Sequence, residues 1–189
     1  IQEMLRQMSV KPAAESIEGV RLVNLREHAE ARGSFTELFR AEWFPQADWT
    51  NTQCNRSVSV RGVVRGLHFH RQQVDFWHCI DGRVKVGLYD LRRSSPSCGV
   101  GQTFDLLAEE PTGLYIPEGV AHGYLALTDM TIFYVVNRYY NPNDEFGVTW
   151  NDPELVLNWG SGEVDLADVL VSERDASNPR LDELTDRPE

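Results

Sequence analysis

Apolar and polar residues alternate along much of the chain between positions 20 and 137. The segment 83–90, Arg-Val-Lys-Val-Gly-Leu-Tyr-Asp, alternates for most of its length, as expected of a strand with one buried face. Helical periodicity is weak throughout, and the only modest candidates are 41–44 and the tail after Asp165. Further short strands are predicted at 63–69, 76–80, 114–116, 122–127 and 131–136.

Turn-forming residues separate these segments. Asp81-Gly82 lies directly between two of the predicted strands and predicts a tight hairpin there, because both residue types tolerate positive φ. Many short strands joined by regular turns indicate an all-β sandwich or barrel. No internal repeat or linker is visible, so we predict one domain at 16–189, preceded by an N-terminal arm at 1–15.

Length and charge limit the classes of function. A chain of 189 residues can bury one substantial core, and its apolar runs are far shorter than the roughly 20 residues of a membrane helix. The net charge of −11 argues against nucleic acid as a partner. It does not exclude a small anion, because two well-placed arginines can hold a diphosphate. No charged-then-apolar export segment opens the chain, so the cytoplasm is the expected location.

Three histidines stand out by their positions. His68 and His70 are two residues apart on a predicted strand, so both rings should project from the same face. His122 follows the turn at Pro117-Glu118-Gly119. If the shared face lines the interior, titratable rings enter a cavity together. The alternative is that they are surface histidines on an exposed face.

Two segments carry a specific resemblance: Gly62-Val-Val-Arg-Gly-Leu-His-Phe69 and Ile116-Pro-Glu-Gly-Val-Ala-His-Gly123. They are similar to motifs of the dTDP-4-dehydrorhamnose 3,5-epimerase family, and the similarity extends from about Ser16 to Asp175. This resemblance implies a cupin jelly-roll β-sandwich with short peripheral helices, assembled as a homodimer. Other segments in the family's order are 16–20, 30–39, 53–57, 139–142, 150–153 and 171–175.

The resemblance also implies a reaction. The family removes a proton next to the C4 ketone of a nucleoside-diphosphate 4-keto-6-deoxysugar and returns one to the opposite face. By position, His68 would be the base, oriented by Asp175, and Tyr134 would be the acid. Without the resemblance, Tyr134 reads as a core aromatic residue, and Asp175 as a helix cap or a solvated tail residue.

Binding roles carry over in the same way. Arg32 and Arg65 match arginines that hold the diphosphate, a task suited to the guanidinium fork. Because the family exchanges strands between subunits, Arg32 would serve the neighbouring subunit's site. The remaining residues expected around the substrate are Glu37, Gln53, Asn55, His122 and Tyr139.

One departure from the family pattern opens a second interpretation. Asp75 stands where the resemblance implies a catalytic lysine, and an unpaired carboxylate beside a developing enolate would oppose the reaction. The spacing of His68, His70, Asp75 and His122 instead fits a cupin metal motif. We expect an epimerase without a cofactor. The alternatives are a cupin sugar isomerase, epimerase or oxygenase that uses one divalent transition metal ion, and a non-catalytic nucleotide-sugar-binding module.

Overall fold

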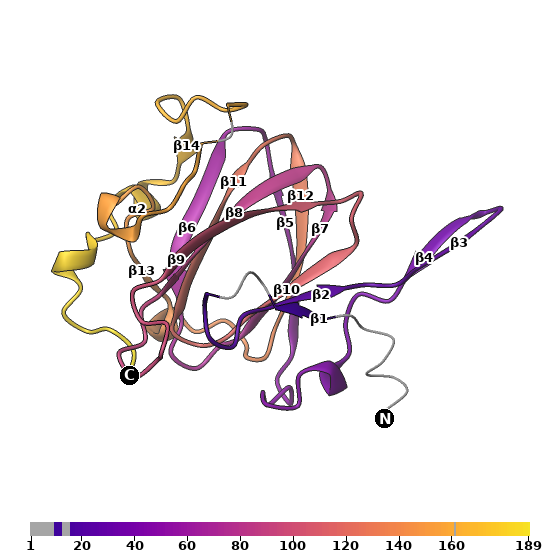
Figure 1. The fold of residues 1–189 in the computed structure, drawn as a ribbon, viewed down its shortest axis with the longest axis horizontal. Helices are drawn as coiled ribbons and strands as arrows, with labels where there is room; N and C mark the ends of the chain where they lie inside the picture. Colours follow the sequence, from indigo (N-terminus) through magenta and orange to yellow (C-terminus); the bar gives the residue numbers. More distant parts are fainter. Residues whose placement is uncertain (1–9, 13–15, 161) are drawn as a thin grey trace.

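Two β-sheets face each other in the computed structural model, which describes residues 10–12, 16–160 and 162–189 (Figure 1). This arrangement confirms the predicted all-β jelly-roll sandwich. In order across the first sheet, the strands are β1 (Val10–Pro12), β2 (Arg21–Asn24), β10 (Thr112–Ile116), β7 (Asp75–Asp81), β12 (Met130–Val136) and β5 (Gln53–Ser59). Across the second sheet they are β13 (Phe146–Gly147), β6 (Val63–Phe69), β11 (Val120–Ala126), β8 (Arg83–Asp90) and β9 (Gly101–Leu107), and β14 (Leu170–Val171) pairs with β6.

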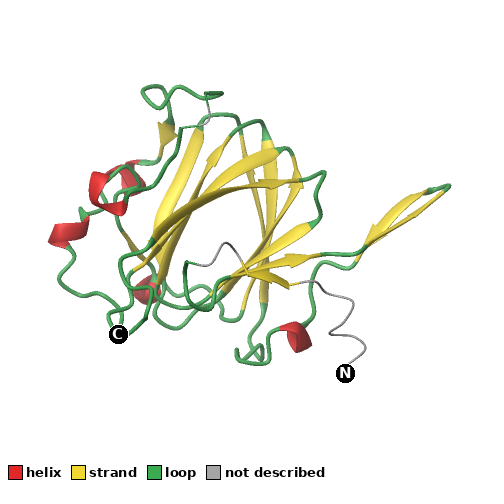
Figure 2. Ribbon diagram, viewed as in Figure 1, coloured by secondary structure: helices red, strands yellow, loops and turns green. Residues whose placement is uncertain are grey.

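A separate hairpin, β3 (Glu27–Glu30) and β4 (Gly33–Thr36), projects from the body of the sandwich (Figure 1). Helices are short and peripheral (Figure 2), and no helix in the described part of the chain is long and apolar enough to span a membrane. The helices are η1 (Ala41–Trp43), η2 (Pro142–Asp144), η3 (Pro153–Leu155), α2 (Glu173–Ala176) and η4 (Leu181–Glu183).

Most predicted strands are confirmed, with β6 and β8 at the predicted bounds. The hairpin predicted at Asp81-Gly82 is wrong. Gly82 does adopt a positive φ of 72°, but β7 pairs with β10 and β12, whereas β8 pairs with β11 and β9 in the other sheet. The turn is a corner of the sandwich. The chain crosses there from one sheet to the other, because both strands must place an apolar face in the shared core.

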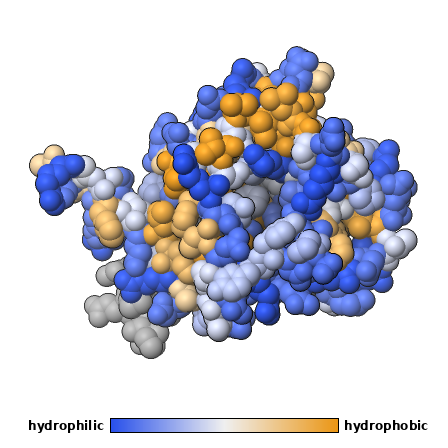
Figure 3. Space-filling model, turned by 180° about the vertical axis from the view of Figure 1, so that it is seen from behind, coloured by the Kyte–Doolittle hydropathy of each residue, from blue (hydrophilic) through white to orange (hydrophobic). Residues whose placement is uncertain are grey.

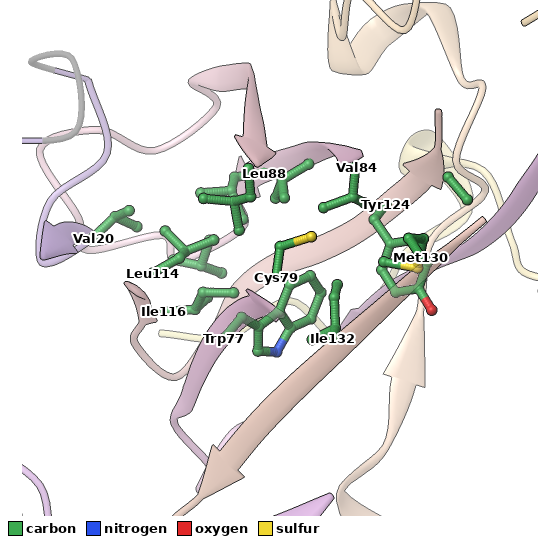
Figure 4. Close-up of a cluster of buried hydrophobic side chains, with 14 of the residues drawn as sticks. Val20, Trp77, Cys79, Val84, Leu88, Leu114, Ile116, Tyr124, Met130 and Ile132 are labelled. Atoms are coloured by element: carbon green, nitrogen blue, oxygen red, sulfur yellow. The ribbon is translucent and has the colours of Figure 1, made fainter. Parts of the chain in front are cut away.

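The interior of the sandwich has an apolar end and a polar end. At the apolar end, Cys79, Leu114 and Met130 pack with Val84 and its neighbours from the opposite sheet (Figure 4). Trp77 and Ile132 belong to the same core and also line the polar end. The same strands carry polar residues further along: β7 begins at Asp75, β11 carries His122 and β12 carries Tyr134. Each of these strands is therefore anchored in the core at one end and presents a functional side chain at the other.

Both outer faces are also covered. Phe69, Leu125 and other residues of the second sheet pack against Trp150, Trp159 and Leu181 of the C-terminal region. On the first sheet, Phe76, Tyr115 and Val135 pack against aromatic residues of the segment after β4, and the rings of Phe44 and Tyr115 are stacked 4.6 Å apart. Because Phe76 points outward, its neighbours Asp75 and Trp77 point inward.

Candidate active site

A cavity of about 320 Å³ occupies the polar end of the sandwich interior. It is lined by side chains from both sheets and from the C-terminal region, as expected for a jelly roll that binds a ligand between its sheets. Most of the residues that the sequence predicts at the site line this cavity. They are His68, Tyr134, Asp175, Gln53, Asn55, Arg65, His122, His70 and Asp75.

His68 forms a direct pair with Asp175. Its Nε2 atom lies 2.7 Å from Asp175 Oδ1, and the carboxylate is only 3% exposed. Burial would raise the pKa of Asp175, but hydrogen bonds from His68 and from the Gly66 amide outweigh burial and hold the pKa below its ordinary value. Asp175 is therefore ionised near neutral pH. The ring donates its Nε2 proton to the carboxylate, which leaves Nδ1 as the basic atom.

Gly66 holds the pair in place. Its backbone amide donates a hydrogen bond of 3.1 Å to Asp175 Oδ2, and its φ is 99°. A Cβ at this position would lie 2.7 Å from the His122 carbonyl oxygen, closer than real Cβ contacts allow. Ser172 supports Asp175 from the other side, because its Oγ accepts the Asp175 amide at 3.1 Å as the N-cap of α2.

Tyr134 lines the same cavity from the opposite sheet. Strand β12, which carries it, pairs with β5 and β7, whereas His68 is on β6. Burial, and secondarily the negative charge of Asp75, raise the pKa of Tyr134. The phenol therefore keeps its proton near neutral pH and can act as a proton donor.

His70, Asp75 and His122 form a second cluster, separate from the His68 pair. One ligand-type atom from each residue lies within 4.8 Å of the others. The rings donate from Nδ1 to backbone carbonyls, His70 to Asp144 O at 2.6 Å and His122 to Val120 O at 2.9 Å. Burial lowers the pKa of His122 to about 4, so this ring is neutral near pH 7.

Strand β5 shows why two residues of the expected nucleotide site reach the cavity. Its residues alternate in exposure, with Gln53 and Asn55 turned inward and Cys54 and Arg56 turned outward. Gln53 Nε2 donates to Asn55 Oδ1 at 2.8 Å. Arg65, which also lines the cavity, forms no ion pair with a carboxylate among the described residues, so its charge can face an anionic ligand.

Three expected binding residues lie outside this cavity. Arg32, with its side chain 85% exposed, is at the tip of the projecting hairpin, where it pairs with Glu30. Glu37 follows the hairpin and pairs with Arg40. Tyr139 is 64% exposed and lines a neighbouring hollow with His70 and Arg138.

The structure adds cavity residues that the sequence did not indicate. Glu145 and Arg174 form an ion pair of 2.8 Å at the wall, and Tyr140 lies beside them. Trp77 packs edge-on against His122, with their ring centres 5.3 Å apart. Arg174 and Tyr140 lie within the family-like segments 171–175 and 139–142, which was the available signal for them. The other lining residues that were not expected at the site are Ser57, Gln73, Gly123, Tyr124, Ile132, Val136 and Ser172.

A histidine paired with a buried carboxylate and a protonated tyrosine face one cavity of a jelly-roll sandwich, an arrangement suited to an enzyme of proton transfer. Comparisons with known proteins agree. Residues 14–183 match the family model described as dTDP-4-dehydrorhamnose 3,5-epimerase. The chain therefore belongs to the dTDP-4-dehydrorhamnose 3,5-epimerase family and is an isomerase.

Individual relatives cover most of the chain. The spore coat polysaccharide biosynthesis protein SpsL of Bacillus subtilis is 38% identical, over 77% of this chain and 97% of its own length. The dTDP-4-dehydrorhamnose 3-epimerase of Streptomyces niveus is 35% identical, over 90% of this chain and 83% of its own length. The crystal structure of RmlC from Legionella pneumophila, in complex with dTDP-4-keto-L-rhamnose, has a TM-score of 0.85 at 29% identity, covering 96% of this chain and 98% of that one.

Proposed function

We propose that the protein epimerises a dTDP-linked 4-keto-6-deoxysugar at C3, or at both C3 and C5. The family supports this substrate class, since its members include both 3,5-epimerases and a 3-epimerase. The polar cavity and the unpaired charge of Arg65 fit a ligand with a diphosphate. A cytoplasmic location, expected from the sequence, is part of this proposal.

The chemistry uses the acidity of carbon next to a ketone. His68 Nδ1 takes the proton from the carbon, and the electrons of the C–H bond move toward the C4 oxygen to form an enolate. The Asp175 carboxylate stabilises the imidazolium through the Nε2 hydrogen bond. Tyr134 then donates its proton to the opposite face of the same carbon, so that the configuration inverts and the ketone re-forms. Proton exchange with solvent restores both residues.

The observation that carries this proposal is the placement of the His68–Asp175 pair and Tyr134 on opposite sheets around one cavity. A substrate ring bound between them would have a base on one face and an acid on the other. A two-base inversion at carbon uses such a pair, whereas simple binding does not need one.

Solvent deuterium uptake tests the proposal. A dTDP-linked 4-keto-6-deoxysugar in D₂O should acquire deuterium at C3, or at C3 and C5, as followed by NMR. His68→Asn and Tyr134→Phe should each lower turnover by about 10²–10⁴-fold. Tyr89→Phe, a buried tyrosine outside the cavity, is the matched control and should keep wild-type turnover. Wild-type protein that binds the nucleotide sugar without any deuterium uptake would contradict the proposal.

A homodimer in which the projecting hairpin completes the partner's site is the second part of the proposal. The hairpin of β3 and β4 projects from the sandwich (Figure 1), Arg32 at its turn does not line the cavity, and the family resemblance implies exchanged strands. The first sheet ends at β5, and the exposed apolar residues near this edge include Val58 and Val60. Figure 3 shows apolar side chains gathered over part of one face, which would suit an interface.

Subunit mixing tests this arrangement. Arg32→Ala and His68→Asn should each be impaired as homodimers. Mixed dimers should regain activity, because an intact His68 site would receive an intact Arg32 from the other subunit. Equal mixing of differently tagged chains should therefore recover a fraction of wild-type activity that follows the fraction of mixed dimers. A monomer in solution, or mixed dimers with no recovery, would reject this part of the proposal.

A further inference from the structure

The cluster of His70, Asp75 and His122 is not required by the proton-transfer steps above. From its geometry, we infer that these three residues form a binding site for one divalent transition metal ion. The site is distinct from the set suggested by the sequence motif, because His68 is not part of it.

The three residues converge from both sheets. His70 follows β6 and His122 is on β11, both in the second sheet, whereas Asp75 opens β7 in the first. Their ligand-type atoms lie within 4.8 Å of one another. Donors at about 2.0–2.2 Å from an ion lie roughly 3–3.5 Å apart. Side-chain rotations that move each donor by about 1 Å would therefore close the cluster around an ion.

The hydrogen bonds of the two rings orient them as ligands. Each Nδ1 faces a backbone carbonyl, Asp144 O for His70 and Val120 O for His122, and must carry a proton to donate to it. In the neutral rings, the lone pair is then at Nε2. Metal-binding histidines commonly have this arrangement, in which a carbonyl fixes the tautomer and the ring orientation.

Asp75 is supported in the same way. Its Oδ1 accepts a hydrogen bond of 3.1 Å from Trp77 Nε1, and its Oδ2 accepts one of 3.0 Å from Gln73 Nε2. The carboxylate is 3% exposed, and no lysine or arginine among the described residues forms an ion pair with it. Buried carboxylates are usually paired with a cation or coordinate a metal, and the neutral indole and amide donors leave this charge unbalanced. A divalent ion would balance it.

Two imidazoles and one carboxylate suit zinc, cobalt, nickel or iron better than calcium or magnesium. His68 lies outside this cluster, and its Nε2 is bonded to Asp175 instead. Three protein ligands leave positions open toward the cavity, where such an ion would polarise an oxygen of the bound ligand. This residue set is therefore compatible with His68 as a free base, whereas the motif of four ligands was not.

Metal binding can be measured without substrate. Protein without a histidine tag is stripped with a chelator, dialysed against Co²⁺ or Zn²⁺, and analysed for metal per chain and by titration calorimetry. We expect about one ion per chain, with Co²⁺ absorption bands typical of nitrogen and oxygen ligands. Asp75→Asn keeps the shape of the side chain and should weaken binding by about 10- to 100-fold or more, as should His70→Gln. Circular dichroism verifies that each variant is folded.

His68→Asn is the matched control, because it removes a neighbouring cavity histidine that is outside the cluster. It should bind the ion with affinity within about twofold of wild type. Three outcomes overturn the inference: no stoichiometric ion in the wild type, equal affinity in Asp75→Asn, or loss of the ion in His68→Asn. These outcomes are separate from deuterium uptake at the sugar, so the metal site and the proposed function can fail independently.

Discussion

The cavity contains two groups of histidine and aspartate side chains, and the two groups differ in their hydrogen bonds. In the first, His68 contacts Asp175 directly, so the carboxylate orients the ring and stabilises its charged form. In the second, His70 and His122 donate to backbone carbonyls, and Asp75 accepts from the neutral side chains of Trp77 and Gln73. The residue types are the same, but in our proposals the first arrangement serves a base and the second serves metal ligands.

This difference shows that histidines in one cavity can be oriented by different partners. A carboxylate partner stabilises the charged ring, whereas a carbonyl partner favours the neutral tautomer with its lone pair on the other nitrogen. Gly66 connects the two clusters, because its amide binds Asp175 and its Cα packs against the His122 backbone. Three measurements can distinguish the contributions of the two clusters, from the largest expected effect to the smallest.

Asp175→Asn should lower turnover by about 10²–10⁴-fold, since an amide does not stabilise the imidazolium of His68. Affinity for Co²⁺ should be nearly unchanged, because the second cluster is left intact. Steady-state kinetics and metal titration measure the two effects in one preparation. Asp105→Asn, which removes a surface partner of Lys85, serves as the control and should change neither quantity. Wild-type turnover in Asp175→Asn would show that the pair does not orient the base.

Gly66→Ala should lower the free energy of unfolding by about 1–3 kcal/mol, because the added Cβ meets the His122 carbonyl at a backbone φ of 99°. Urea unfolding measures the change. Gly62→Ala is the matched control: its φ is 86°, but no atom lies within 4 Å of the added Cβ. Gly66→Ala should lower the free energy of unfolding more than Gly62→Ala does. Equal losses would show that the close approach between the two clusters is not required.

The smallest effect concerns stability at acid pH. The pKa of Asp175 is lower in the folded protein than its unfolded value near 3.8, so its stabilising contribution is complete above that value and is lost as the pH falls through the folded pKa. Urea unfolding at pH 5, 4 and 3 should therefore show a steeper loss of stability in the wild type than in Asp175→Asn. Parallel curves would mean that the pair does not contribute to folding.

Much of the fold was predictable because apolar alternation marks the strands that enclose the core. Strands β6 and β8 begin and end at the residues that the sequence predicts. Strand β5 was not singled out, because its inward residues, such as Gln53 and Asn55, are polar and line the cavity. The corner at Gly82 was mistaken for a hairpin because a sharp turn does not reveal whether its flanking strands pair with each other. That choice depends on the two-sheet core.

The site was predictable in part. His68 and His122 are opposite each other in the register of β6 and β11. The two motifs that contain them therefore correctly indicated one shared site. Asp175 comes from a segment more than one hundred positions away, and only the family resemblance related it to His68. The separation of His68, which pairs with Asp175, from the other three motif residues depends on which atoms the rings contact. Sequence spacing does not contain that information.

The split between an apolar and a polar end of the sandwich has a consequence for how such proteins diversify. Because β7, β11 and β12 are anchored by core residues such as Cys79 and Met130, substitutions at their cavity ends leave that anchoring largely intact. The scaffold and the chemistry can therefore change at different rates along a single strand. Replacements at a few inward positions of the cavity can therefore change what is bound while the packed end of each strand stays as it is.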